Sequence, residues 1–372
     1  MKKSDRVRTV AVLGAGHGGC AATADLTARG FSVRLHARRE ATLTPLREAG
    51  GINATGIHDG FYVPELMTTD VAEAVRGADL IVLVVPSVAH HDYAVALAGL
   101  VGPDTPILLN PGHTGGGLHF LNELRAAGYV GELRLAETVS LTYVTRMVGP
   151  ATVGIYSYIR NLKFAALPAR FADEIFELVS PVFPEIVQVR NVLETALSNM
   201  NAVFHPTGML MNVGWIERTD GKFLFYKEGI TESVGRATQA VDDERMAVAA
   251  ALNVPSRSFL ESFLSAGLTT AESVATGSIA KACEASEPNA RIQSPSSLNH
   301  RYVHEDVGYG LVPFSAFGKL AGVPTPTIDA LIQIASVSSG IDYTREGLTA
   351  EKMGLAGLSR DNLIRFVEAG VA

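Results

Sequence analysis

The stretch RTVAVLGAGHGG, residues 8–19, decides the fold of this chain. An apolar run over 10–13 leads into Gly14, Gly16 and Gly19, a helical pattern over 20–29 follows, and a second apolar segment covers 31–37. In such a strand–loop–helix–strand unit, the first glycine permits a tight turn, the second lets a pyrophosphate approach the backbone, and the third lets helix and strand pack closely. The free N–H groups at the helix start attract phosphates. We therefore predict a dinucleotide-binding loop at Gly14, Gly16 and Gly19.

The rest of the first half repeats the alternation of strand and helix. Apolar runs occur at 78–87, 105–112 and 132–138, with helical patterns at 71–76, 90–100 and 117–127 between them, and 160–167 and 186–189 are expected to extend the sheet. Alternating elements of this kind predict a Rossmann-type doubly wound parallel sheet in an α/β domain over residues 1–189.

Residues 190–372 change in pattern. Strand signals end, and helical periodicity dominates at 192–215, 233–253, 256–264, 325–336 and 359–369. We therefore expect an all-α C-terminal domain over 190–372, which agrees with the two domains expected for 372 residues.

Composition excludes several classes of function. A net charge of −7 gives no basic footprint for nucleic acid, and no apolar run reaches the length of a membrane span. The start, MKKSDRVRTV, has no apolar core of a signal peptide. Cys20 and Cys283 form no CxxC pair, as expected of buried thiols in a reducing compartment. We expect a cytoplasmic protein with no nucleic-acid partner and no membrane association.

Two loops follow predicted strands at the edge where doubly wound sheets bind ligands. Pro86 and Ser87 end one strand, and we expect them to cover the cofactor. The loop NPGHTGGG, residues 110–117, ends another and places His113 and Thr114 where cofactor and substrate are expected to meet. The alternative for this loop is a flexible connector.

The stretch NMNAVFHPTGMLMN, residues 199–212, has helical spacing interrupted by a proline. Asn201 and His205 fall on one narrow polar stripe of an otherwise apolar helix, which is typical of a cleft wall. Pro206 is expected to kink the helix beside His205. The alternative is a core histidine near an ordinary kink.

The stretch RYVHED, residues 301–306, contains further candidates, although its local pattern does not decide between helix and loop. Arg301 is suited to a bidentate grip on a carboxylate, and Asp306 to orienting a histidine. His304 is a rival to His205, and a solvated charge cluster is the alternative for the whole stretch.

These motifs together resemble the opine dehydrogenases of the octopine/nopaline type. LGAGHGG, NPGHTGG, NMNAVFHP and RYVHED carry the resemblance, which runs through nearly the whole chain. It implies reductive condensation of a 2-oxo acid, typically pyruvate, with the amine of an L-amino acid. NAD(P)H supplies the hydride, no metal is required, and the protein is often a homodimer. The resemblance also implies that His205 is the catalytic histidine, Asp306 its acidic partner and Arg301 the substrate-binding arginine. Asn201, one turn before His205 on the same stripe, is then expected to hold a substrate carboxylate or carbonyl.

Cofactor choice is read at the end of the second strand, where NAD-specific folds carry a carboxylate for the ribose 2′-OH. Ala37 stands there, and Arg38 and Arg39 follow at once. These residues predict that NADPH is preferred, with looser selection that also accepts NADH as the alternative.

Two other functions remain open on the sequence. A ketopantoate or 3-hydroxyacid reductase has the same domain order but usually carries a catalytic lysine on the long helix, and no lysine lies between Lys163 and Lys222. A dinucleotide sensor without chemistry would be expected to lack the histidine, aspartate and arginine set.

Overall fold

The computed structural model describes residues 7–371, so part of the start from which we predicted no signal peptide lies outside it. The chain divides into two compact units, Met1–Thr195 with Arg365–Ala372, and Ala196–Ile364. The sequence did not anticipate that the last residues return to the first unit. The functional division at 189/190 stays a prediction.

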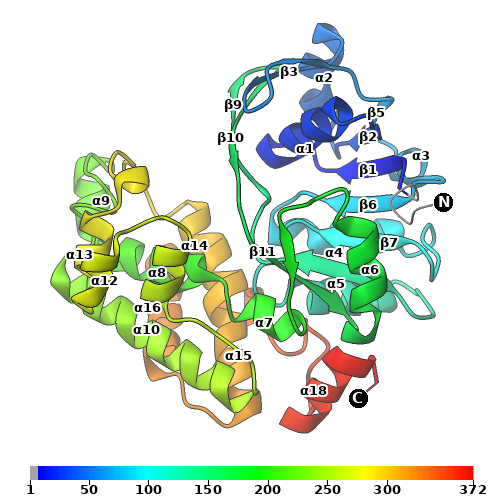
Figure 1. The fold of residues 1–372 in the computed structure, drawn as a ribbon. Helices are drawn as coiled ribbons and strands as arrows, with labels where there is room; N and C mark the ends of the chain where they lie inside the picture. The colour runs from blue at the N-terminus through cyan, green and yellow to red at the C-terminus, as the bar shows by residue number, and fades with distance from the viewer. Residues whose placement is uncertain (1–6, 372) are drawn as a thin grey trace. The chain divides into compact units, whose positions relative to one another are not determined.

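The first unit contains an eight-stranded sheet in the order β12-β11-β8-β7-β6-β1-β2-β5 (Figure 1). All neighbouring strands are parallel except β11, which is antiparallel to β8. The fold class is confirmed, and β11 is the strand that departs from the parallel arrangement. No helix crosses over between β8 and β11, and a parallel pair needs such a crossover. The bounds are β1 Thr9–Leu13, β2 Ser32–His36, β5 Leu66–Thr68, β6 Leu80–Leu83, β7 Pro106–Leu109, β8 Arg134–Thr138, β11 Leu162–Leu167 and β12 Ile186–Gln188.

The helices of this unit follow the predicted alternation with strands. Their local sequence explains their starts: α3, for example, begins after Asp70, whose carboxylate accepts hydrogen bonds from the N–H groups of Ala72 and Glu73. The bounds are α1 His17–Ala28, α2 Glu40–Ala49, α3 Val71–Val75, the 3₁₀ turn η2 Ser87–Ala89, α4 His90–Leu97, α5 Gly116–Ala126, the 3₁₀ turn η3 Ala169–Phe171, α6 Ala172–Val179 and α7 Val192–Ala196.

A second sheet, in the order β4-β3-β10-β9, was not predicted (Figure 1). Its strands are β3 Ile52–Gly56, β4 Gly60–Tyr62, β9 Tyr143–Gly149 and β10 Thr152–Tyr158. Helix α1 is tied to this sheet because the buried Asp25 carboxylate accepts hydrogen bonds from the Tyr143 hydroxyl at 2.7 Å and the Tyr158 hydroxyl at 2.8 Å. After the buried Tyr143, strand β9 alternates exposed and half-buried residues, so it lacks the continuous apolar run of a strand covered on both faces.

The second unit is helical, as predicted. Its elements are α8 Met200–Leu210, α9 Val213–Thr219, α10 Glu232–Ala251, α11 Phe259–Ser265, α12 Ala271–Ala275, α13 Ile279–Glu284, the 3₁₀ turn η4 Glu287–Asn289, α14 Arg301–Asp306, the π-helical turn η5 Val307–Leu311, α15 Val312–Ala321, α16 Pro326–Ser339 and α17 Tyr343–Glu346, and α18 Arg360–Ala369 ends in the first unit.

The single long helix expected over 192–215 is wrong, because three helices cover this stretch. Asn199 starts α8 by accepting a hydrogen bond from the Asn201 N–H, and Asn212 precedes α9. The Asn199 side chain satisfies a free N–H group of the helix start, the position that asparagine favours over helix interiors, whereas the Asn212 side chain donates to the carbonyls of Gly208 and Gly229. Helix α8 then continues past Pro206 to Leu210.

Arg245 fixes the chain just before α8. Its side chain is fully buried and pairs with Asp242 at 2.6 Å, and the guanidinium also donates to the carbonyls of Leu197 and Arg257. The other Asp242 oxygen accepts from the Phe259 N–H at 2.6 Å. A buried ion pair persists only when its remaining polar atoms are bonded, and here those bonds hold α10 to the segment that enters α8.

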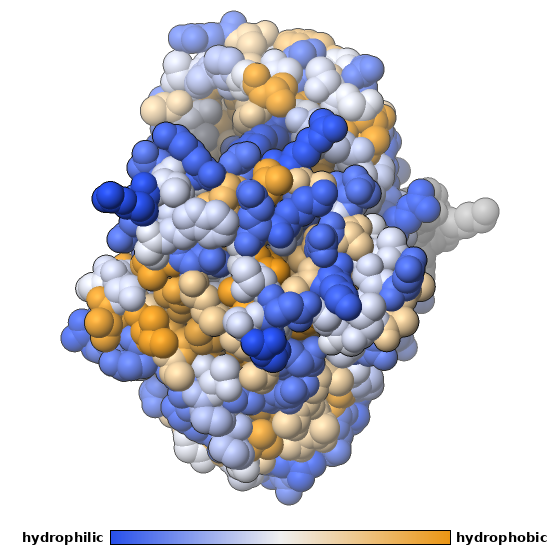
Figure 2. Space-filling view, turned by 90° about the vertical axis from the view of Figure 1, so that its left-hand side faces the viewer, coloured by the Kyte–Doolittle hydropathy of each residue, from blue (hydrophilic) through white to orange (hydrophobic). Residues whose placement is uncertain are grey.

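Among residues 7–371, no helix combines the length and the apolar character needed to cross a membrane. Large hydrophobic side chains that remain exposed include Met211 and Trp215 near α9 and Ile334 and Val337 on α16. Figure 2 shows one face of the molecule, on which hydrophobic residues lie in groups among hydrophilic ones.

Candidate active site

The glycine loop has the geometry that its spacing predicts. Gly14 has a φ of +119° and its N–H donates to the His36 carbonyl at 2.9 Å, which makes the tight turn. Gly19 packs directly against the Gly14 carbonyl, with no room for a side chain. At Gly16 a Cβ would meet no atom within 4 Å, and α1 begins at the next residue. The loop therefore offers an open approach to a helix start, which fits a dinucleotide pyrophosphate.

The end of β2 carries no carboxylate. Ala37 is buried and its N–H donates to the Thr68 carbonyl at 3.2 Å, whereas Arg38 and Arg39 are exposed. The Arg38 guanidinium pairs with Asp92, and both side chains are about half exposed. Such exposed pairs contribute little free energy, so Arg38 can exchange this partner for another anion.

The loop of residues 110–117 is buried along its whole length, so it is not a flexible connector. The Asn110 amide braces it: Nδ2 donates to the Thr142 hydroxyl at 2.8 Å, and Oδ1 accepts from the Thr142 N–H at 3.0 Å. His113 adopts a φ of +58°, and both His113 and Thr114 are buried in this unit. Pro86 and Ser87 were predicted to cover the cofactor. Pro86 is exposed, and Ser87 is buried at the start of η2.

Glu137 supports the same loop and was missed by sequence reasoning. Its fully buried carboxylate accepts hydrogen bonds from the Gly117 N–H at 2.8 Å and from the Thr195 hydroxyl. A Cβ on Gly117 would lie 2.7 Å from this carboxylate, which explains glycine there. Burial raises the pKa of Glu137 to about 7, although the bonds from Thr195 and Gly117 act in the opposite direction. The signal that could have revealed it is a lone carboxylate at the end of an apolar strand.

The second unit brings His205 and Asp306 together. His205 lies in the middle of α8, and Asp306 is the last residue of α14. The His205 Nδ1 and Asp306 Oδ2 atoms are 2.8 Å apart, and the two side chains are 8% and 3% exposed. A carboxylate on Nδ1 selects the tautomer that keeps Nε2 available, the arrangement that lets a histidine act as acid or base.

Aromatic rings surround this pair, and sequence reasoning singled out none of them. The Tyr302 ring lies parallel to the imidazole, with centroids 3.6 Å apart and planes inclined by 11°. The Tyr226 hydroxyl is 3.5 Å from Nε2. The Phe225 ring is 6.3 Å away and tilted. The histidine therefore works in apolar surroundings that strengthen its bond to Asp306.

The other predicted residues of this unit have distinct environments. Arg301 opens α14, is 58% exposed and pairs with Glu305 at 2.7 Å. Burial works against its charge, but Glu305 and Asp306 outweigh that effect and raise the pKa of Arg301, which stays a cation. Asn201 is half-buried, one turn before His205. The rival His304 is bonded elsewhere, to the Tyr343 hydroxyl at 2.7 Å and the Asn299 amide at 2.9 Å.

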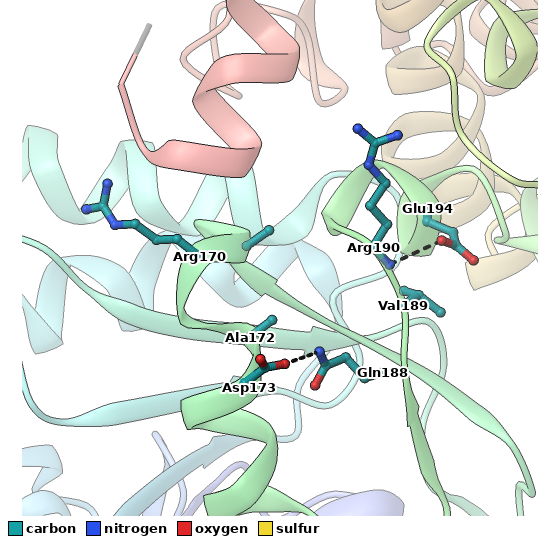
Figure 3. Close-up of a pocket in the computed structure, with 8 residues that line it drawn as sticks. Arg170, Ala172, Asp173, Gln188, Val189, Arg190 and Glu194 are labelled. Carbon is teal, nitrogen blue, oxygen red and sulfur yellow. Dashed lines mark hydrogen bonds between the residues drawn. The ribbon is translucent and has the colours of Figure 1, made fainter.

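A surface pocket of about 640 Å³ lies elsewhere, within the first unit (Figure 3). Its lining is polar, with Asp173 accepting a hydrogen bond from Gln188 at 2.8 Å and Glu194 from the Arg190 N–H at 3.3 Å. None of the residues predicted to bind or react lines it. Its volume alone does not make this pocket the candidate active site, since none of the predicted catalytic or binding side chains lies in it. Within residues 7–371, no three His, Cys, Asp or Glu side chains are placed to hold a metal.

Two protein families match the chain. The NAD-dependent glycerol-3-phosphate dehydrogenase N-terminus matches residues 9–121, and the NAD/NADP octopine/nopaline dehydrogenase alpha-helical domain matches residues 188–339. An opine dehydrogenase from Arthrobacter sp. (strain 1C) is 39% identical over 366 residues, which cover 97% of this chain and 99% of that protein. The chain belongs to the opine dehydrogenase family.

Solved structures share the fold. Octopine dehydrogenase with NADH and L-arginine is 19% identical with a TM-score of 0.77, covering 96% of this chain and 98% of its own. Yersinopine dehydrogenase with NADP+ bound is 17% identical with a TM-score of 0.72, covering 99% of each chain. One of these two structures contains NADH and the other NADP+.

Family membership defines the class of reaction. The chain is an NAD(P)-dependent oxidoreductase that acts on CH–NH groups by reductive condensation of a keto acid with an amine. The reductase and sensor alternatives are set aside.

Replacing Glu137 with Gln should change how stability depends on pH. The folded-state pKa of about 7 lies above the ordinary 4.5, so the folded state binds the extra proton and the unfolding free energy falls as pH rises through 7. Between pH 4.5 and 8 the wild type should lose about 3 kcal/mol relative to Glu137→Gln. Urea unfolding at both pH values measures this, with the exposed Glu48→Gln as control. Parallel pH dependence of the wild type and Glu137→Gln would contradict it.

Proposed function

We propose that this enzyme condenses a pyruvate-like 2-oxo acid with the amine of an L-amino acid and reduces the resulting imine, with NADPH as its preferred cofactor. In this proposal residues 1–189 bind the cofactor and residues 190–372 carry the catalytic groups. The observation that carries it is the buried hydrogen bond between His205 and Asp306 in a family of this chemistry.

The reaction needs protons at two stages. Loss of water from the first adduct requires a proton on the departing oxygen, and imine reduction requires a protonated nitrogen. His205 is the group for both steps, because histidine exchanges protons near neutral pH. Asp306 accepts the Nδ1–H and stabilises the imidazolium, while Nε2 gives and takes the proton. The nicotinamide, when bound, supplies the hydride.

The remaining predicted residues bind and orient. Arg301 would hold the oxo-acid carboxylate, because it carries several N–H groups of which Glu305 uses part. Asn201 would hold a second carboxylate or carbonyl from the same face of α8. His113 and Thr114 would contribute from the 110–117 loop, and Pro86 and Ser87 from the turn after β6.

Removing the histidine or its partner should slow the chemical step. We expect His205→Ala to lower kcat by roughly 10²-fold, the scale of a lost general acid or base. Asp306→Asn should fold and also lower kcat, whereas Arg301→Ala should mainly raise KM for the oxo acid. Steady-state kinetics tests this, with His304→Ala as control because His304 is bonded outside the pair. Normal turnover in His205→Ala would refute the assignment.

The proposed NADPH preference rests on the end of β2. An aspartate there would repel the 2′-phosphate, and Ala37 removes that repulsion. Arg38 is paired with Asp92, but that pair is exposed, and Arg39 is exposed too, so both cations are accessible to a phosphate. Asp92 and Glu40 are the nearby carboxylates that oppose this effect; Glu40 begins α2 and pairs with Arg47.

Exchanging this segment should reverse the cofactor preference. Ala37→Asp combined with Arg38→Ile adds an acceptor for the ribose 2′-OH and removes a cation, so kcat/KM should shift toward NADH. The matched control is Arg146→Ile, which removes an exposed positive charge from β9 of the same unit. The proposed NADPH preference is wrong if wild-type kcat/KM for NADH equals or exceeds that for NADPH.

The same proposal includes a cytoplasmic homodimer. Two free, buried cysteines, Cys20 and Cys283, support a reducing compartment. The dimer rests on the family resemblance.

The reaction itself has a direct assay. NADPH should be oxidised when pyruvate and an L-amino acid are present together, and mass spectrometry should find a secondary amine dicarboxylate. A product mixture that contains only a 2-hydroxy acid would overturn the proposed reaction.

A further inference from the structure

Besides the bond from its edge to Asp306, the His205 imidazole has contacts on one face and at Nε2. The Tyr302 ring covers one of its faces at 3.6 Å and nearly parallel. Tyr302 is itself held in place, because the His300 ring meets it edge-on at 4.6 Å and 90°. Tyr302 lies on α14 four residues before Asp306, so one helix supplies both the contact with the face and the contact with the edge.

The Tyr226 hydroxyl lies at the opposite end of the ring. It is 3.5 Å from Nε2, and a hydrogen bond joins the Tyr226 and Tyr302 side chains. Burial and the neighbouring Tyr302 raise the pKa of Tyr226 well above its usual value, so this hydroxyl keeps its proton. The Phe204 ring stacks on Tyr226 at 5.0 Å and fixes its position.

These contacts act differently on the two protonation states of His205. A cation over the face of an aromatic ring is attracted by the ring's quadrupole, and more strongly where water is excluded. A neutral imidazole gains no such term. The charged state is the one that His205 must hold before it gives a proton to substrate.

We propose that Tyr302 and Tyr226 are positioning residues for the catalytic His205: the Tyr302 ring fixes the imidazole plane and stabilises its protonated form, and the Tyr226 hydroxyl fixes the direction of Nε2. This inference rests on the proposed proton-transfer role of His205. It extends that role to two residues that have no assigned part in the reaction.

The other titratable groups near the His205 imidazole do not mask the effect of Tyr302 on its charged form. Asp306, on the same helix as Tyr302, is the one anion among residues 7–371 that is bonded to the imidazole, and it remains in every variant below. Burial and then the charge of His205 lower the pKa of His300, so His300 stays neutral beside a charged imidazole. Arg301 is paired with Glu305, and burial raises the pKa of the Cys283 thiol near Tyr226, so that thiol is neutral.

The test compares three substitutions. Tyr302→Leu removes the ring, Tyr302→Phe keeps the ring and removes the hydroxyl, and Tyr226→Phe removes the hydroxyl near Nε2. The matched control is Tyr343→Phe, which breaks the comparable tyrosine–histidine bond to His304 on the same helix. Should Tyr302→Leu fail to fold, Tyr302→Met, which fills more of the space, replaces it.

Kinetics gives the first readout. When kcat is plotted against pH, the basic limb of the curve for Tyr302→Leu should lie about half a unit to one pH unit lower than in the wild type, because the ring that stabilises the protonated imidazole is gone. Tyr302→Phe and Tyr343→Phe should keep the wild-type limb. Tyr226→Phe should lower kcat by about fivefold with little change in KM, the scale of one lost hydrogen bond.

A second readout does not depend on turnover. The NMR signals of the His205 ring, identified by their loss in His205→Ala, are titrated in the absence of substrates. A titration midpoint that is lower in Tyr302→Leu than in the wild type and Tyr302→Phe supports the positioning role, even if no secondary amine is formed and the proposed reaction fails. Equal midpoints in all three proteins overturn the positioning role, even if His205→Ala is inactive and the proposed reaction stands.

Discussion

The hydrogen bond between His205 and Asp306 constrains the second unit, because the partners are 101 residues apart and must meet at 2.8 Å inside an apolar cluster. Helices α8 and α14 must therefore pack closely. The π-helical turn η5 that follows Asp306 carries Gly310, where a Cβ would lie 2.6 Å from the Ala202 side chain on α8. Two small residues at this crossing allow the approach on which the bond depends, and π-helical turns are often found next to functional residues.

Polar groups buried farther from the pair serve the same requirement. The Arg245–Asp242 pair fixes the chain before α8, and the Asn199 side chain fixes the first turn of α8. In the first unit, hydrogen bonds of Asn110 and Glu137 hold the 110–117 loop in place in the same way. In both units a reactive or binding segment is therefore held by buried hydrogen bonds, whose loss would leave polar atoms unpaired at a high cost in free energy.

The sequence predicted what depends on local pattern. The glycine spacing and the buried strands identified the large sheet, and helical periodicity identified the second unit. The antiparallel direction of β11 was not predicted and the second sheet was missed, because strand pairing and half-exposed strands leave weak local signals. The long helix over 192–215 was wrong because a capping asparagine was not recognised. His205 and Asp306 were identified by resemblance, since periodicity does not show which helices meet. Tyr226, Tyr302 and Glu137 were missed because their roles depend on neighbours distant in sequence.

The central claim is that Asp306 holds His205 with its proton on Nδ1, so that Nε2 is the atom that works. Nitrogen-15 NMR of the labelled enzyme, at a pH where the imidazole is neutral, measures this directly, because protonated and unprotonated ring nitrogens have distinct chemical shifts. The account predicts the Nδ1–H tautomer in the wild type and a mixture of tautomers in Asp306→Asn. A wild-type His205 that carries its proton on Nε2 would contradict it.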